Sequence, residues 1–114
     1  MYTYKAKVLS VYDGDTCTVL LSLGCHVTLQ QSIRLYGINT PELRGDTKLA
    51  GLEARDFLSE QILNKDVYVQ TFKDKTEKYG RLLGKIYLSD PAPGNVPTIN
   101  ELMISSGHAV SYME

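Results

Sequence analysis

Three short segments of the sequence carry polar side chains that could bind a metal ion and a phosphate group. In chain order they are Asp13-Gly14-Asp15-Thr16, Arg34-Leu35-Tyr36-Gly37-Ile38-Asn39-Thr40-Pro41-Glu42 and Lys78-Tyr79-Gly80-Arg81. Carboxylate, amide and carbonyl oxygens are ligands that a hard cation prefers. A planar guanidinium group can form paired hydrogen bonds to phosphate oxygens, which a lysine cannot reproduce. These segments therefore indicate chemistry at a phosphate group, provided that the fold brings them together.

Oxygen ligands for a metal ion are available in the first two segments. Asp15 offers a carboxylate oxygen, Asn39 an amide oxygen and Thr40 a backbone carbonyl. This set suits Ca²⁺, which takes about six to eight oxygen ligands and tolerates irregular geometry. The sequence has no cluster of histidine and cysteine, which disfavours zinc. We expect Asp13 to hold the metal-binding loop or a bound water.

Each segment also has an ordinary structural explanation. Asp13-Gly14-Asp15-Thr16 has the composition of a hairpin turn. A charge inside an apolar strand needs a partner, so Arg34 could form a salt bridge, for example with Glu42. Pro41-Glu42 could end a loop, and Tyr79-Gly80-Arg81 could be a plain turn.

The first half of the chain is predicted to form a meander of three strands, over residues 4–11, 16–23 and 27–36. Their alternating, β-branched and aromatic residues are typical of strands. Asp13-Gly14 is a strong turn signal between the first two, and Gly24 interrupts the chain before the third.

The second half begins with a helix, because apolar residues recur at helical spacing over residues 49–63. Residues 67–72 and 82–88 are predicted strands. Residues 89–98 hold three prolines and a glycine and are predicted to form a loop. A short helix follows over residues 100–106, with Gly107 just past its end.

This order of elements predicts a mostly β, α+β fold. It matches a five-stranded OB-type barrel with a helix between strands three and four and a short C-terminal helix. An α+β sandwich of similar content is the main alternative. Strand ends converge on one rim of a closed barrel, so Asp15, Asn39 and Arg81 are expected to meet there. We expect residues 1–114 to form a single domain.

Composition excludes several classes of protein. The 114 residues are 43% hydrophobic and 22% charged, unlike collagenous, disordered or disulfide-scaffold chains. Twelve basic and thirteen acidic residues give a net charge of −1, which argues against a general polyanion-binding tail. Nucleic-acid binding would therefore need a local basic site helped by a metal ion.

The sequence predicts neither a membrane span nor a signal peptide. No apolar run approaches the ~20 residues that cross a bilayer, and the N-terminus lacks an apolar core. We expect a cytoplasmic or phage-encoded protein, without excluding secretion. Cys17 and Cys25 are predicted to lie offset along one hairpin, so free thiols are expected.

The three segments closely resemble motifs of the staphylococcal (micrococcal) nuclease, or thermonuclease, family. That family has Asp-Gly-Asp-Thr after a strand, an arginine followed by Gly-Ile-Asp-Thr-Pro-Glu, and a later Tyr-Gly-Arg. Gly51-Leu52-Glu53-Ala54 fits the start of a family helix, and the segment from Asn100 to Gly107 fits the next family helix. The resemblance covers roughly residues 5–112.

The resemblance implies a Ca²⁺-dependent phosphodiesterase. Such an endonuclease hydrolyses DNA, with RNA as a second substrate, has little sequence specificity and leaves 3′-phosphates. The alternative is an OB-fold module that binds nucleic acid or protein and has lost catalysis. The presence of Arg34, Glu42 and Arg81 favours the enzyme. Beyond nucleic acid and metal no protein partner is implied, and a monomer is expected.

The resemblance also implies roles for individual residues. Glu42 would orient or deprotonate the attacking water, while Arg34 and Arg81 would bind phosphoryl oxygens. Tyr79 and Tyr112 would contact the nucleotide, by stacking on a base or donating a hydroxyl to a phosphate.

Asn39 departs from the family pattern. The family usually has an aspartate here that ligates calcium, and asparagine keeps the oxygen but removes one formal charge. Ligand charge is one of the factors that set Ca²⁺ affinity, so weaker Ca²⁺ binding is expected.

Overall fold

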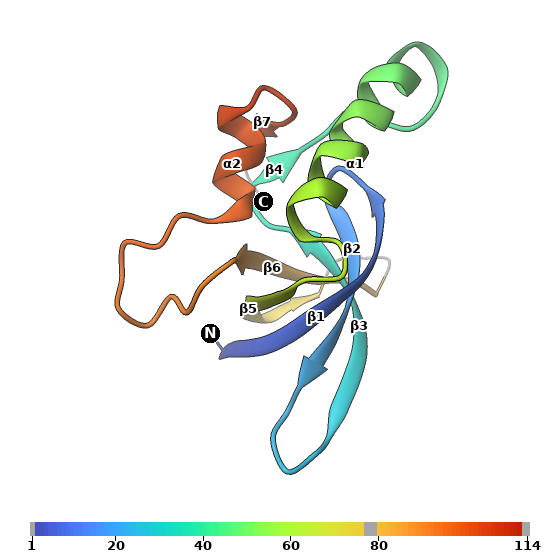
Figure 1. Ribbon diagram of the computed structural model, residues 1–114. Helices are drawn as coiled ribbons and strands as arrows, with labels where there is room; N and C mark the ends of the chain where they lie inside the picture. Colours follow the sequence, from blue (N-terminus) through green and yellow to red (C-terminus); the bar gives the residue numbers. More distant parts are fainter. Residues whose placement is uncertain (1, 77–79, 113–114) are drawn as a thin grey trace.

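Five strands close into a barrel in the order β1-β2-β3-β6-β5 (Figure 1). The computed structural model describes residues 2–76 and 80–112. The barrel strands are β1 (Tyr2–Asp13), β2 (Thr16–Ser22), β3 (Thr28–Leu35), β5 (Asp66–Thr76) and β6 (Leu82–Tyr87). Closure confirms the OB-type prediction over the sandwich alternative.

The barrel closes through a parallel pairing between β3 and β6, whereas its other strand pairs are antiparallel. In this pairing Arg34 lies opposite Leu83, and Ile33 lies opposite Leu82. Arg81 directly precedes β6. The closure therefore brings Arg34 and Arg81, which are far apart in the sequence, to the same part of the barrel.

The helix α1 (Lys48–Ile62) follows the first three barrel strands and packs against β1. Its bounds differ from the predicted helix by one residue at each end. The buried residues recur at helical spacing and form one face, which consists of Gly51, Ala54, Leu58 and Ile62. Figure 1 shows α1 lying across one end of the barrel, near the turn between β1 and β2.

The helix α2 (Ile99–Ser105) begins with a capping box. The Thr98 side chain accepts from the Glu101 amide at 2.9 Å, and the Glu101 carboxylate accepts from the Thr98 backbone at 3.4 Å. Gly107 has a φ of +85° just past the helix, as predicted for a residue at C′.

Three short elements were not predicted. The strand β4 (Ile38–Asn39) pairs with β7 (Val110–Ser111), and a 3₁₀ turn, η1, covers Gly45–Thr47. Elements of two or three residues have no hydrophobic period to detect. The β4–β7 pairing matters because it fixes the two residues that directly precede Thr40.

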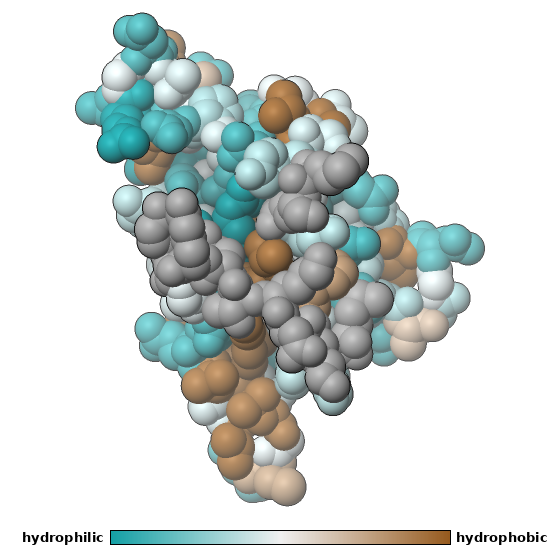
Figure 2. All heavy atoms as spheres, turned by 180° about the vertical axis from the view of Figure 1, so that it is seen from behind, coloured by the Kyte–Doolittle hydropathy of each residue, from teal (hydrophilic) through white to brown (hydrophobic). Residues whose placement is uncertain are grey.

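The end of β2 and the start of β3 project beyond the barrel as a hairpin. Leu23, Val27 and Leu29 on this hairpin are each about half exposed. Figure 2 shows the corresponding brown surface at the lower end of the molecule. Cys17 is buried within β2, Cys25 is exposed near the tip, and both are free thiols, as expected. No helix in the part of the chain described is long and apolar enough to span a membrane.

Candidate active site

A cleft of about 370 Å³ opens at one rim of the barrel. Its described lining residues are Asp13, Asp15, Arg34, Asn39, Thr40, Pro41, Glu42, Arg81 and Tyr112. Every predicted site residue within the described part of the chain is therefore in one place, together with Pro41. The remaining one, Tyr79, lies outside the described residues.

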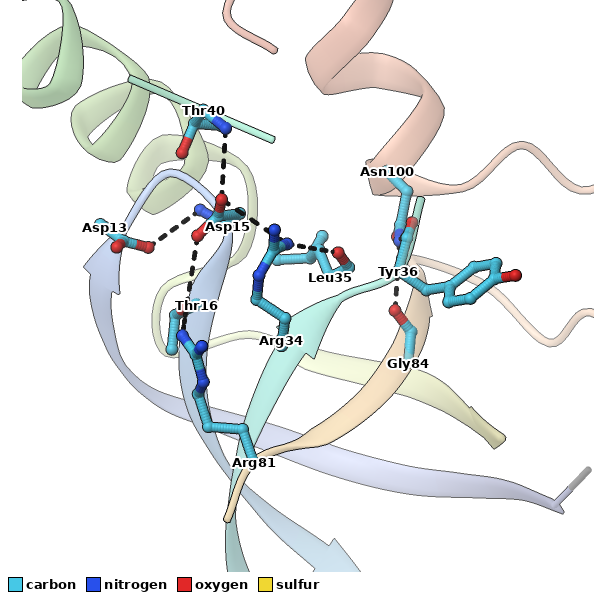
Figure 3. Close-up of polar contacts among 10 residues, drawn as sticks. All are labelled: Asp13, Asp15, Thr16, Arg34, Leu35, Tyr36, Thr40, Arg81, Gly84 and Asn100. Carbon is cyan, nitrogen blue, oxygen red and sulfur yellow. Dashed lines mark hydrogen bonds and ion pairs between the residues drawn. The ribbon is translucent and has the colours of Figure 1, made fainter. Parts of the chain in front are cut away.

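Asp15 is the centre of the hydrogen bonds in this cleft (Figure 3). Its Oδ2 accepts from the Thr40 amide at 3.2 Å, and its Oδ1 accepts from the Thr16 hydroxyl at 3.3 Å. Its own amide donates to Asp13 Oδ1 at 3.1 Å. The turn between β1 and β2 is therefore tied to the segment that follows β4.

Arg34 points from the end of β3 toward the same carboxylate. Its Nη1 lies 3.5 Å from Asp15 Oδ2 and donates to the Leu35 carbonyl at 2.8 Å. A salt bridge between Arg34 and Glu42 was the structural alternative, but the structure pairs Arg34 with Asp15. Glu42 instead accepts from Arg44 Nε at 3.1 Å, in a pair exposed to solvent.

Arg81 reaches the cleft through Thr16. Its Nη1 donates to the Thr16 hydroxyl at 2.9 Å, and that hydroxyl donates to Asp15 (Figure 3). Thr16 is 5% exposed, so this link is shielded from water. Sequence reasoning missed its role, although Thr16 lies within the predicted turn motif.

Negative charge is concentrated in the turn between β1 and β2. Burial raises the pKa of Asp13, and the neighbouring Asp15 carboxylate contributes through a hydrogen bond and its charge, so that this pKa reaches about 6. A cation placed near these carboxylates would relieve that repulsion.

Two glycines let α1 approach the cleft closely. A Cβ on Gly14 would lie 2.8 Å from Ala54 Cβ, and a Cβ on Gly51 would lie 2.6 Å from the Glu42 carbonyl oxygen. Neither position has room for a side chain. The helix therefore packs directly against the β1–β2 turn and against the backbone at Glu42.

Asn100, in the first turn of α2, ties this helix to β6 and to the segment that follows β3. Its amide nitrogen donates to the carbonyls of Tyr36 and Gly84, at 2.8 and 3.1 Å, and its oxygen accepts from the Ile86 amide at 3.1 Å. Sequence reasoning assigned it no role. The only sign of this role in the sequence was a polar residue in the first turn of a mostly apolar helix.

Tyr112 comes to the cleft because its amide donates to the Gly37 carbonyl at 2.8 Å, next to the β4–β7 pair. In that pair Asn39 lies opposite Val110. The segment after α2 therefore holds Asn39 through the strand pairing and brings Tyr112 to the cleft.

The donor chemistry of the cleft fits a hard cation. A buried carboxylate, an amide and a backbone carbonyl can be supplied by Asp15, Asn39 and Thr40. Among the side chains that the structure describes, no group of three or more His, Cys, Asp or Glu could hold a metal. Asp15, Asn39 and Thr40 offer one carboxylate and two neutral oxygen donors, which fits Ca²⁺ better than a zinc centre.

Comparison with known proteins adds to this geometry. The family model described as "Staphylococcal nuclease homologue" matches residues 32–114. The chain belongs to the staphylococcal nuclease family. The match covers the cleft residues from Arg34 onward, and family membership agrees with the resemblance of the motifs.

Curated relatives from several bacteria align with this chain. It is 34% identical to a thermonuclease of Staphylococcus hyicus over 85 residues, which cover 72% of this chain and 47% of that protein. It is 30% identical to a micrococcal nuclease of Shigella flexneri over 112 residues, 96% of this chain and 59% of that protein. An uncharacterized endonuclease of Escherichia coli is 31% identical over 106 residues, 93% and 60% of the two chains. The chain therefore spans between 47% and 60% of the length of these relatives.

Proposed function

We propose that this chain is a Ca²⁺-dependent nuclease that hydrolyses phosphodiester bonds of DNA or RNA with little sequence specificity. One observation carries the proposal: two arginines converge on one buried carboxylate, in a cleft that Glu42 also lines. The names of the family relatives agree with it.

Asp15, Asn39 and Thr40 would hold the metal ion, with Asp13 supporting the loop. When bound, Ca²⁺ would help to generate the nucleophile and neutralise charge on the phosphoryl group. The oxygen-only donor set of the cleft supports this assignment.

Arg34 and Arg81 would bind the phosphoryl oxygens that gain charge in the transition state. Their partners support this role, because the Leu35 carbonyl and the Thr16 hydroxyl hold each guanidinium at the cleft before a substrate arrives. Donors held in place cost little reorganisation when charge develops.

Glu42 would accept a proton from the attacking water. The water oxygen bonds to phosphorus while the bond from phosphorus to the 5′-oxygen breaks. The departing oxygen takes a proton to become a 5′-hydroxyl, so the phosphate stays on the 3′ end. Since the Arg44–Glu42 pair is exposed, it holds Glu42 only weakly and leaves it available.

Tyr112 would contact the nucleotide from the wall of the cleft, and we extend the same role to Tyr79. We propose a monomer as the working unit.

Cleavage of end-labelled single-stranded DNA tests the proposal, with millimolar Ca²⁺ and with chelator. We expect cleavage only with Ca²⁺, products whose mobility shifts after phosphatase treatment, and strong loss in Arg34→Ala. Arg55→Ala is the matched control, since Arg55 lies on α1 and pairs with Asp56. A wild-type protein that binds DNA but cleaves neither DNA nor RNA would instead support the binding module.

A further inference from the structure

A second groove adjoins the cleft at Arg81. It has a volume of about 480 Å³, and its described lining residues are Tyr12, Thr16, Thr18, Ser32 and Arg81. Thr16 and Arg81 are joined by a hydrogen bond of 2.9 Å, which Figure 3 shows beside Asp15. Arg81 lines both hollows, so a bound chain could pass from one to the other across its guanidinium.

Tyr12 is the most prominent side chain of this groove. It is 71% exposed and directly precedes Asp13 of the cleft. On β1 the register shifts here, because Val11 lies opposite Cys17 and Asp13 lies opposite Thr16. Tyr12 therefore has no residue opposite it on β2. Such bulges are frequent beside active sites, where they redirect a side chain.

The chemistry of the groove suits a nucleobase better than a phosphate. Among its described lining residues Arg81 is the only charged one, and Thr18 and Ser32, which are cross-strand partners, add hydroxyls. Hydroxyls can donate to and accept from base edges or sugars. The exposed ring of Tyr12 can stack on any base, provided that the base is unpaired.

We propose that the groove is a subsite for a single-stranded polynucleotide, with an unpaired base stacked on Tyr12. This rests on the proposed function and deepens it by assigning a nucleotide-binding subsite outside the cleft. The strand runs from the cleft across Arg81 into the groove. Tyr112 lines the cleft but not the groove, and Tyr12 lines the groove but not the cleft. The two exposed tyrosines thus serve different nucleotides of one strand.

Binding without cleavage tests the subsite. Fluorescence anisotropy in chelator at low salt would use a labelled thymidine oligonucleotide of roughly eight nucleotides and a labelled dinucleotide. We expect Tyr12→Ala to weaken the longer probe by roughly 5-fold to 150-fold, the range of one base–aromatic stack. The dinucleotide should bind as to wild type, and Tyr12→Phe should retain affinity. Tyr2→Ala, an exposed tyrosine on the same strand, is the matched control.

Abasic probes locate the stacked base. An abasic position that weakens wild-type binding should have no further effect in Tyr12→Ala. A fully paired duplex of the same sequence should be insensitive to Tyr12→Ala. The subsite would be overturned if Tyr12→Ala lost as much affinity for the duplex, for the dinucleotide or for that abasic probe as for the intact single strand.

Cleavage assays in parallel separate this inference from the proposed function. Unchanged oligonucleotide binding by Tyr12→Ala, with wild-type cleavage intact, would overturn the subsite alone. Tyr12-dependent binding by a wild-type protein that cleaves nothing would support the subsite and overturn the nuclease. A wild-type protein that binds no oligonucleotide in chelator but cleaves with Ca²⁺ would also overturn the subsite alone. One that neither binds nor cleaves would overturn both.

Discussion

The Asp15 carboxylate lies 3.5 Å from the Arg34 guanidinium, and the two side chains are only 9% and 12% exposed. Arg34 is therefore held in the cleft by the same carboxylate that we assign to the metal. A positive charge so close lowers the attraction of the site for a cation, while it prepares the arginine for a phosphate. Binding the metal ion and positioning Arg34 for a phosphate therefore make opposite demands on Asp15.

Arg34→Ala should therefore change metal affinity and catalysis in opposite directions. Removing the neighbouring positive charge should tighten Ca²⁺ binding by roughly tenfold in calorimetry. Cleavage should fall by about 10²–10³-fold, as for other lost electrostatic donors. Arg55→Ala should change neither quantity. Weaker Ca²⁺ binding by Arg34→Ala would contradict the assignment of Asp15 as a shared partner.

Asn39→Asp should restore a formal charge to the metal site. Asn39 is exposed at the end of β4 and lines the cleft, so the added carboxylate requires no buried rearrangement. We expect Ca²⁺ binding to tighten by roughly tenfold, equivalent to about 1.4 kcal/mol. Asn95→Asp adds the same charge in an exposed loop and should leave the affinity unchanged. Equal or weaker binding by Asn39→Asp would reject Asn39 as a ligand.

Glu42→Gln separates proton transfer from binding. Losing a general base should lower the cleavage rate by about 10²–10⁴-fold. Single-stranded oligonucleotide and Ca²⁺ should still bind, because Glu42 is not assigned to either. Glu60→Gln, at an exposed position of α1, should cleave like wild type. If Glu42→Gln retained full cleavage, another group would have to accept the proton.

Asn100→Ala should destabilise the fold more than a surface change. It would leave the Ile86 amide and the carbonyls of Tyr36 and Gly84 without their side-chain partner. We expect the free energy of unfolding in urea to fall by roughly 3 kcal/mol. Ser105→Ala, exposed on the same helix, should stay within about 0.5 kcal/mol of wild type. A loss below about 1 kcal/mol would mean that Asn100 does not anchor α2 to the barrel.

The two cysteines should differ in reactivity. Burial, together with the charge of Asp13, raises the pKa of the Cys17 thiol to about 12. The reactive thiolate is therefore scarce at about pH 8, and the sulfur is shielded as well. An alkylating reagent should modify one thiol rapidly in the native protein and both after unfolding. Cys25→Ser should remove the rapid reaction, and two rapid thiols in native protein would be inconsistent with this fold.

Local patterns predicted the main elements well. The predicted helix over residues 49–63 corresponds to α1 at Lys48–Ile62, and the predicted helix over residues 100–106 corresponds to α2 at Ile99–Ser105. Helical spacing, caps and turns are short-range signals, so one sequence contains them in full. The strand β1 is longer than predicted, Tyr2–Asp13 against residues 4–11, since pairing with β5 and β2 extends a strand beyond its apolar residues.

The sequence by itself determined which residue types were available, the order of the strands and helices, and the family motifs. Only the tertiary structure decided that Arg34 pairs with Asp15 rather than Glu42, that Thr16 links Arg81 to the same carboxylate, and that Tyr12 and Tyr112 line separate hollows. Thr16 and Arg81 are 65 positions apart and meet because β3 and β6 pair in parallel to close the barrel. Periodicity reports on neighbours along the chain, whereas such contacts depend on how all the strands pack at once.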